Sequence, residues 1–99
     1  MVTLAVGLVL EHGEMKAFER GDAQIAVANV DGTLWAFDDA CTHRQCSLAE
    51  GKLEDAVVTC PCHGSQFAVR TGERLRGPAV RPVRTYPVRY ENSVVRVEL

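Results

Sequence analysis

Cysteine and histidine residues gather in two short segments of this 99-residue chain. The first cysteine segment, residues 41–46, reads Cys-Thr-His-Arg-Gln-Cys, and the second cysteine segment, residues 60–65, reads Cys-Pro-Cys-His-Gly-Ser. Sixteen residues, 44 to 59, separate the histidine of the first from the opening cysteine of the second. Each segment therefore offers a thiolate, an imidazole and an additional cysteine, which are side chains that bind soft and borderline metals.

Three kinds of chemistry fit these side chains. Zinc could be held tetrahedrally by Cys41, His43, Cys60 and His63, although Cys-x-His is a tight spacing for two ligands of one small ion. The four cysteines could instead form two disulfides, which would leave the histidines without a role. A [2Fe–2S] cluster presents two metals, so each segment could donate one ligand to each iron. The residue types alone leave these alternatives open.

The elements that position the two segments are predicted to be short strands. Residues 24–30 and 33–37 are apolar runs that flank Asp31-Gly32, and an Asp-Gly pair between such runs favours a tight hairpin turn. Alternation along the second run predicts that Leu34 and Trp35 face opposite sides of the sheet. No long stretch has a sustained helical period, which argues against an α-helical fold.

A second hairpin is expected from residues 83–90 and 94–99, in which Pro82 and Pro87 remove hydrogen-bond donors and predict an edge or a kink. The predicted fold class is therefore all-β, a small antiparallel β-sandwich or barrel. An irregular insert is expected near residues 40–80, and it contains all four cysteines and two of the three histidines.

Composition and charge exclude several other classes of protein. Hydrophobic content of 46% and charged content of 24% are typical of one globular domain. The net charge of −2, with −5 in residues 1–50 and +3 in residues 51–99, does not indicate a nucleic-acid-binding protein. The longest apolar stretch, residues 2–10, is about half of the roughly 20 residues that span a membrane. We therefore expect no membrane segment and a cytoplasmic location.

The two cysteine segments resemble the two boxes of Rieske [2Fe–2S] proteins, and the paired boxes at this spacing form a specific signal. Further residues are placed as in Rieske ferredoxins of oxygenase systems, namely 49–51, Phe67, 71–72, 77–78 and 86–88. The resemblance covers essentially the whole chain. It implies a single Rieske domain over residues 1–99, of the ISP-domain type, with a two-loop cluster-binding subdomain at about residues 40–80.

The resemblance also implies a set of ligands for one [2Fe–2S] cluster. Cys41 and Cys60 would bind the inner iron, and His43 and His63 would bind the outer iron, which changes oxidation state. Neutral imidazoles in place of two thiolates make the oxidised centre less negative, so an electron is added more easily. Rieske potentials accordingly lie at roughly −150 to +300 mV, above those of plant-type ferredoxins.

Residues around the cluster are implied to set its potential within that range. Ser65 would donate its hydroxyl to a cluster sulfur, whereas Phe67 stands where high-potential respiratory members have a tyrosine. We therefore expect an intermediate potential. Gln45 departs from the glycine usual in the first box, which leaves the conformation of that loop in doubt. Pro78 matches the proline loop that shields the cluster from water.

The remaining cysteines, Cys46 and Cys62, match positions that form a disulfide in respiratory Rieske proteins. The resemblance implies that this possible disulfide ties the two loops together, and free buried thiols in a reducing cytosol are the alternative. Arg44 beside His43 is a candidate for partner docking or an ordinary solvated arginine. His12 has no partner motif near it and is expected to be a surface residue.

The implied function is one-electron transfer by a monomeric carrier, with no catalytic residues of its own. The electron donor would be an NAD(P)H-dependent flavoprotein reductase, and the acceptor a terminal oxygenase of the ring-hydroxylating type. The main alternative is a small Rieske subunit of a nitrite reductase or another redox complex. A respiratory Rieske subunit would normally carry an anchor and insertions, and a structural zinc module is the non-redox alternative.

Overall fold

The computed structural model describes residues 3–7, 10–21, 23–41, 46–62, 64–91 and 94–98, which form three antiparallel sheets. The strand orders are β1-β11-β10, β2-β3-β4-β9 and β5-β6-β7-β8. The strands are β1 (Thr3–Gly7), β2 (Met15–Arg20), β3 (Ala23–Val30), β4 (Thr33–Asp38), β5 (Lys52–Glu54), β6 (Val57–Thr59), β7 (Gln66–Ala68), β8 (Arg74–Arg76), β9 (Thr85–Tyr86), β10 (Val88–Glu91) and β11 (Val94–Glu98). A three-residue 3-10 helix, η1 (Leu48–Glu50), precedes β5. The all-β prediction is confirmed.

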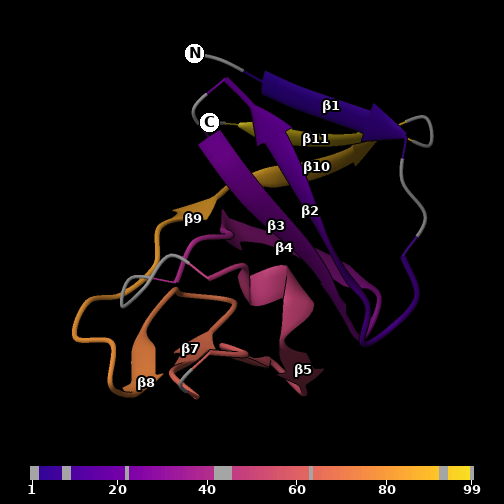
Figure 1. The fold of residues 1–99 in the computed structure, drawn as a ribbon. Helices are drawn as coiled ribbons and strands as arrows, with labels where there is room; N and C mark the ends of the chain where they lie inside the picture. The colour runs from indigo at the N-terminus through magenta and orange to yellow at the C-terminus, as the bar shows by residue number, and fades with distance from the viewer. Residues whose placement is uncertain are drawn as a thin grey trace.

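The sheet β2-β3-β4-β9 lies between the other two sheets, as Figure 1 shows. Strand β3 is buried from Ile25 to Val30, and its apolar residues pack into two different clusters on its two faces. Ile25 and Val27 pack with Val95 and Val97 of β11, whereas the alternate residues of β3 face the cysteine segments. This alternation is the period of two expected of a strand whose two faces are both buried.

The predicted hairpin of β3 and β4 is confirmed. Asp31 and Gly32 form its turn with φ of 53° and 87°, and these positive angles are what a tight Asp-Gly turn requires. The predicted alternation also holds, because Trp35 packs on the cluster that contains Cys41 and Leu34 packs on the opposite one.

The second predicted hairpin is only partly right. Strands β10 and β11 do pair, but residues 83–87 do not continue the strand β10. Instead Thr85 and Tyr86 form β9, which pairs with β4 in the central sheet. Pro87 lies between β9 and β10 and cannot donate a ladder hydrogen bond, so the chain changes sheets there. The turn residues 92 and 93 lie outside the described part of the chain.

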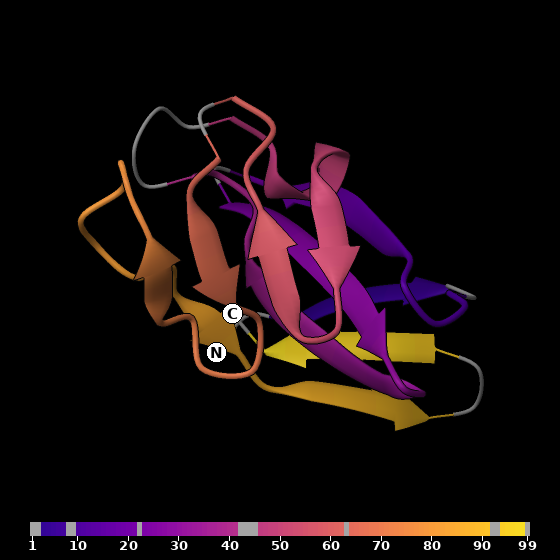
Figure 2. The ribbon, with the colours of Figure 1, turned by 90° about the horizontal axis from the view of Figure 1, so that it is seen from below.

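The insert expected near residues 40–80 is less irregular than predicted. It contains the four-stranded sheet β5-β6-β7-β8, whose strands lie side by side in Figure 2. Three-residue strands such as β6 and β8 are too short to leave a clear alternating pattern in the sequence. This sheet matters for the site because β6 leads into the second cysteine segment and β7 leads out of it.

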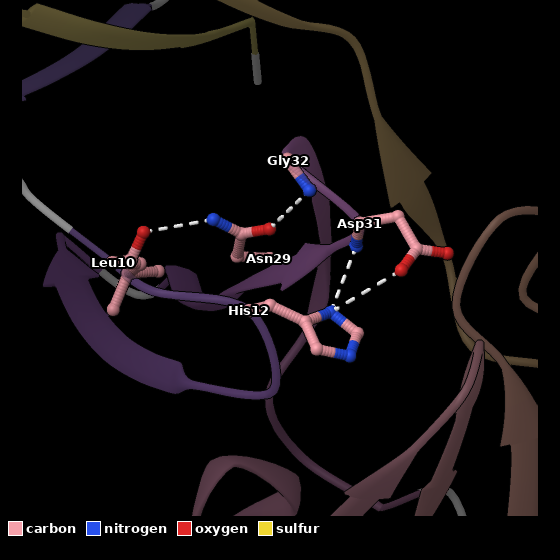
Figure 3. Close-up of polar contacts among 5 residues, drawn as sticks. All are labelled: Leu10, His12, Asn29, Asp31 and Gly32. Atoms are coloured by element: carbon pink, nitrogen blue, oxygen red, sulfur yellow. Dashed lines mark hydrogen bonds and ion pairs between the residues drawn. The ribbon is translucent and has the colours of Figure 1, made fainter.

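A polar cluster holds residues 10–14 against the β3–β4 turn (Figure 3). The Asn29 side chain donates to the Leu10 carbonyl at 2.8 Å and accepts from the Gly32 N–H at 2.8 Å. His12 Nδ1 accepts from the Asp31 N–H at 2.9 Å, and the His12 side chain is 60% exposed. His12 is thus the expected surface residue. It lies at the turn end of β4, and this six-residue strand separates it from Cys41 by about 20 Å.

Candidate metal centre

The ends of the first cysteine segment are held together at the end of β4. The Cys41 N–H donates to the Cys46 carbonyl at 2.9 Å, and Ala40 and Ser47 form an isolated antiparallel bridge just outside it. Cys41 is 1% exposed and belongs to the apolar cluster beneath this segment. The strand β4 therefore delivers a buried thiol to the base of the first segment.

The second cysteine segment is closed in the same way between β6 and β7. The Cys60 N–H donates to the Ser65 carbonyl at 2.8 Å. Donor and acceptor are five positions apart in sequence, as they are in the first segment. Gly64, with φ of 80°, adds a hydrogen bond from its N–H to the Cys60 carbonyl. Cys60 is 3% exposed and lies in the same apolar cluster as Cys41. Two buried thiols thus occupy matching places in two matching segments.

A disulfide between Cys46 and Cys62 joins the two segments, with Cα atoms 6.4 Å apart. The predicted pairing of these cysteines is confirmed. The Cys60 sulfur lies within 4.8 Å of both disulfide sulfurs, so the three sulfurs form one group. Because Cys46 and Cys62 are bonded to each other, Cys41 and Cys60 are the cysteines left as thiols.

The structure describes only part of the predicted site. Cys41 and Cys60 are described, whereas the predicted ligands His43 and His63 lie outside the described residues, as do Arg44 and Gln45. The described part fits an iron–sulfur group, because two buried thiols on two joined segments supply the soft, anionic donors that such a group needs. The imidazole half of the ligand set stays a prediction.

Ser65 is fully buried next to Cys60, and its hydroxyl oxygen accepts a hydrogen bond from the Ala79 N–H at 3.0 Å. The hydroxyl proton is therefore left to donate to another acceptor, as the proposed role of Ser65 requires. Phe67 is also fully buried and packs in the apolar cluster. Pro78 is exposed on the loop that carries Ala79, so this loop reaches the second segment through a backbone group.

Sequence reasoning missed Asp39, which is 5% exposed and anchors the first segment. Its carboxylate accepts hydrogen bonds from the Ser47 hydroxyl at 2.6 Å and from the Ala49 N–H at 2.9 Å. Its backbone carbonyl accepts from the Leu48 N–H at 2.7 Å. The available signal was an acidic residue two positions before Cys41 with a serine just beyond Cys46. The side chain pairing itself depends on the closed segment between them.

Gly51 brings the exit of the first segment against the entry of the second. A Cβ atom at Gly51 would overlap the Thr59 carbonyl oxygen and lie 3.1 Å from Cδ of Pro61. Only glycine permits this close approach of the two backbones. The chain that follows the first segment is thus packed against the chain that enters the second, and the disulfide joins the segments themselves.

A model of the Rieske [2Fe–2S] domain matches residues 2–87, and the chain belongs to this family. It is 46% identical over 90 residues to the ferredoxin component of biphenyl 2,3-dioxygenase from Rhodococcus jostii RHA1, covering 91% of this chain and 84% of that protein. It is 45% identical over 76 residues to the 3-phenylpropionate/cinnamic acid dioxygenase ferredoxin subunit of Shigella boydii, covering 76% and 72% of the two chains.

Solved structures agree with these relatives. A ferredoxin of Sphingomonas yanoikuyae B1 superposes with a TM-score of 0.84 at 33% identity, covering 90% of this chain and 88% of that one. A chain from a complex of reduced oxygenase and oxidised ferredoxin of carbazole 1,9a-dioxygenase gives 0.89 at 32% identity, covering 98% and 100%. The chain is therefore a Rieske-type ferredoxin with a [2Fe–2S] cofactor, an electron-transfer component and not a catalytic subunit.

Proposed function

We propose that this chain, as a single Rieske domain over residues 1–99, holds its cluster with Cys41 and Cys60 on one iron and His43 and His63 on the other. The observation that carries the proposal is the pair of buried thiols at matching positions of two joined segments, in a chain of the Rieske family. When bound, the cluster takes up and returns one electron at a time.

The residues of the chain would protect and tune that centre. Burial of Cys41 and Cys60 at 1% and 3% exposure keeps water from their sulfurs. The Ala79 N–H fixes the Ser65 oxygen, so that the hydroxyl proton is directed to a neighbouring acceptor. Phe67 has no such proton to donate. Of the two hydroxyl donors found in respiratory Rieske proteins, this chain keeps the serine and lacks the tyrosine. This difference supports a cluster potential below that of the respiratory proteins.

The proposed partners are an NAD(P)H-dependent flavoprotein reductase as electron donor and a terminal ring-hydroxylating oxygenase as acceptor. Support for the acceptor comes from the relatives, which are named as ferredoxin components of dioxygenases, and from the ferredoxin–oxygenase complex of carbazole 1,9a-dioxygenase. No helix long and apolar enough to cross a membrane occurs among the described residues. We propose that the chain works as a monomer in the cytoplasm.

The ligand assignment is tested by replacing the two histidines singly, with His43→Ala and His63→Ala. Each variant is expected to lose iron and acid-labile sulfide, because an iron ligand is removed. His12→Ala is the matched control, since His12 is exposed and lies at the far end of β4. Full iron and sulfide content in either ligand variant, or loss of iron in the control, would contradict the assignment.

A further inference from the structure

Positive charge is concentrated in one stretch of this acidic chain. Residues 70–84 contain five arginines and one glutamate, a formal charge of +4, whereas the whole chain carries −2. All five arginines are exposed. Since the rest of the chain is acidic, this stretch is the positively charged part of the sequence.

Strand β8 and the loop after it lie within this positively charged stretch. Strand β8 is the edge strand of its sheet (Figure 2). All three of its residues are exposed. Val80, on the loop after β8, is 83% exposed, and Leu75 is 48% exposed. We call the surface formed by Arg74, Leu75, Arg76 and Val80 the arginine edge.

The two arginines of the arginine edge can pair with carboxylates of a partner protein. Among the described residues, no carboxylate forms an ion pair with Arg74 or Arg76. By contrast, Arg89 of β10 pairs with Glu98 of β11 at 3.1 Å. Leu75 stands between the two arginines in β8, and Val80 follows four residues after Arg76. Exposed apolar side chains and arginines without an ion pair are the kinds of side chain that protein interfaces use.

The arginine edge lies beside the candidate metal centre. Strand β8 pairs with β7, with Arg76 opposite Gln66, and Gln66 directly follows Ser65. The loop after β8 reaches back to the second cysteine segment through the hydrogen bond from Ala79 to Ser65. A protein docked on the arginine edge would therefore lie next to the second segment.

The opposite edge of the same sheet has the opposite charge. Around β5, the exposed residues Glu50, Glu54 and Asp55 outnumber the one exposed cation, Lys52. The sheet thus carries negative charge at one edge and positive charge at the other. Such a charge gradient orients an approaching charged surface before contact.

We propose that the arginine edge docks a carboxylate-rich surface with an apolar centre on the terminal oxygenase. This inference rests on the proposed function, and the oxygenase is chosen because a similar chain was solved in complex with one. Arginine pairs with carboxylates through its planar fork, and the exposed Val80 and Leu75 can supply apolar contact. Exposed charges at an interface act mainly on the association rate, and salt weakens them.

The test compares Arg76→Glu with Arg96→Glu, a matched charge reversal at an exposed strand position of β11. The probe is the purified oxygenase component of biphenyl 2,3-dioxygenase from Rhodococcus jostii RHA1, and the KM for each iron-loaded ferredoxin is measured at low and high salt. Arg76→Glu is expected to raise this KM about tenfold at low salt, with the difference shrinking at high salt. Arg96→Glu is expected to change it by less than about twofold.

Equal KM values for the two variants would overturn the inference, as would an effect confined to reduction by the flavoprotein reductase. A wild-type chain that carries no cluster or reduces no oxygenase would contradict the proposed function instead. In that case, the affinity of each variant for poly-L-glutamate tests the arginine edge independently of electron transfer. Weaker binding by Arg76→Glu than by Arg96→Glu supports the inference, and equal binding, or tighter binding of wild type to double-stranded DNA, overturns it.

Discussion

Asp39 and Ser65 each use a buried side-chain oxygen to hold one of the two cysteine segments. The Asp39 carboxylate accepts two hydrogen bonds beyond the first segment, and the Ser65 oxygen accepts one from the loop after β8. Both side chains are hydrogen-bonded because buried polar groups need protein partners when water is excluded. The cysteine pairs could be predicted from the sequence, but the partners of Asp39 could not. The Ala40–Ser47 bridge places these partners beside Asp39, and no local sequence pattern contains that pairing.

Replacement of Asp39 by alanine should lower the free energy of unfolding by about 2–4 kcal/mol, because Ser47 and Ala49 lose a charged acceptor. Asp39→Asn keeps one acceptor oxygen and should cost about half as much. Thermal unfolding of the iron-loaded protein measures both. Glu50→Ala is the control, since Glu50 is exposed nearby, and it should change stability by less than about 0.5 kcal/mol. An Asp39→Ala variant as stable as this control would contradict the role.

Replacement of Ser65 by alanine should lower the midpoint potential of the cluster by about 60–130 mV. This range takes the hydrogen bond to be stronger in the reduced state by about 1.5–3 kcal/mol, the strength of a bond to a charged acceptor, converted for one electron. Ser47→Ala is a matched control, because the Ser47 hydroxyl donates to Asp39. Redox titration followed by visible absorbance measures both potentials. An unchanged potential in Ser65→Ala would show that its hydroxyl does not act on the cluster.

Individual turns and short strands set where the two cysteine segments meet. The β3–β4 hairpin could be predicted because Asp31-Gly32 has a known turn preference. The strands β5 to β8 could not, because three-residue strands carry too few positions for a periodic pattern. Likewise, the sequence predicts that Pro87 interrupts a strand, but not that the preceding residues pair with β4.

Gly72 shows how a single turn position supports the loop after β8. It is buried with φ of 80°, and a Cβ atom there would overlap the Val83 carbonyl oxygen. Gly72→Ala should therefore cost about 3 kcal/mol or more, from backbone strain and overlap together. Gly32→Ala is the matched control, with φ of 87° and no atom within 4 Å, and it should cost only about 1–2 kcal/mol. Equal thermal midpoints for the two variants would reject the close approach.

Tyr86 links β9 to β4 through a hydrogen bond from its hydroxyl to Asp38. Burial, with the hydrogen bond and the negative charge of Asp38, raises the pKa of Tyr86 to about 12. An unfolded tyrosine loses its proton near pH 10, so the folded state holds more protons between pH 10 and 12. The contribution of Tyr86 to the free energy of unfolding is therefore fully present below pH 10 and declines as the pH rises toward 12.

Denaturant unfolding of wild type and Tyr86→Phe at pH 9 and pH 11 measures this contribution. Wild type is expected to lose more stability than the variant between the two pH values, because phenylalanine has no proton to lose. A loss of equal size in both proteins would show that Tyr86 does not carry the alkaline dependence.

The three sheets have different roles in the molecule. The central sheet buries both faces, the sheet β1-β11-β10 covers one of them, and the sheet β5-β6-β7-β8 carries the second cysteine segment on the other (Figure 1). Composition and strand patterns could predict the all-β class. They could not predict that the charge asymmetry of the sequence becomes a positive edge beside the candidate centre. Such an edge depends on strand order, which no local pattern contains.

We propose that two thiolates and two imidazoles of this chain bind one [2Fe–2S] cluster. Electron paramagnetic resonance of the dithionite-reduced protein, with iron, zinc and acid-labile sulfide measured on the same sample, tests it most directly. We expect a red-brown protein with about two irons and two sulfides per chain and a paramagnetic resonance signal after reduction. A colourless protein with one zinc, no labile sulfide and no signal would contradict it.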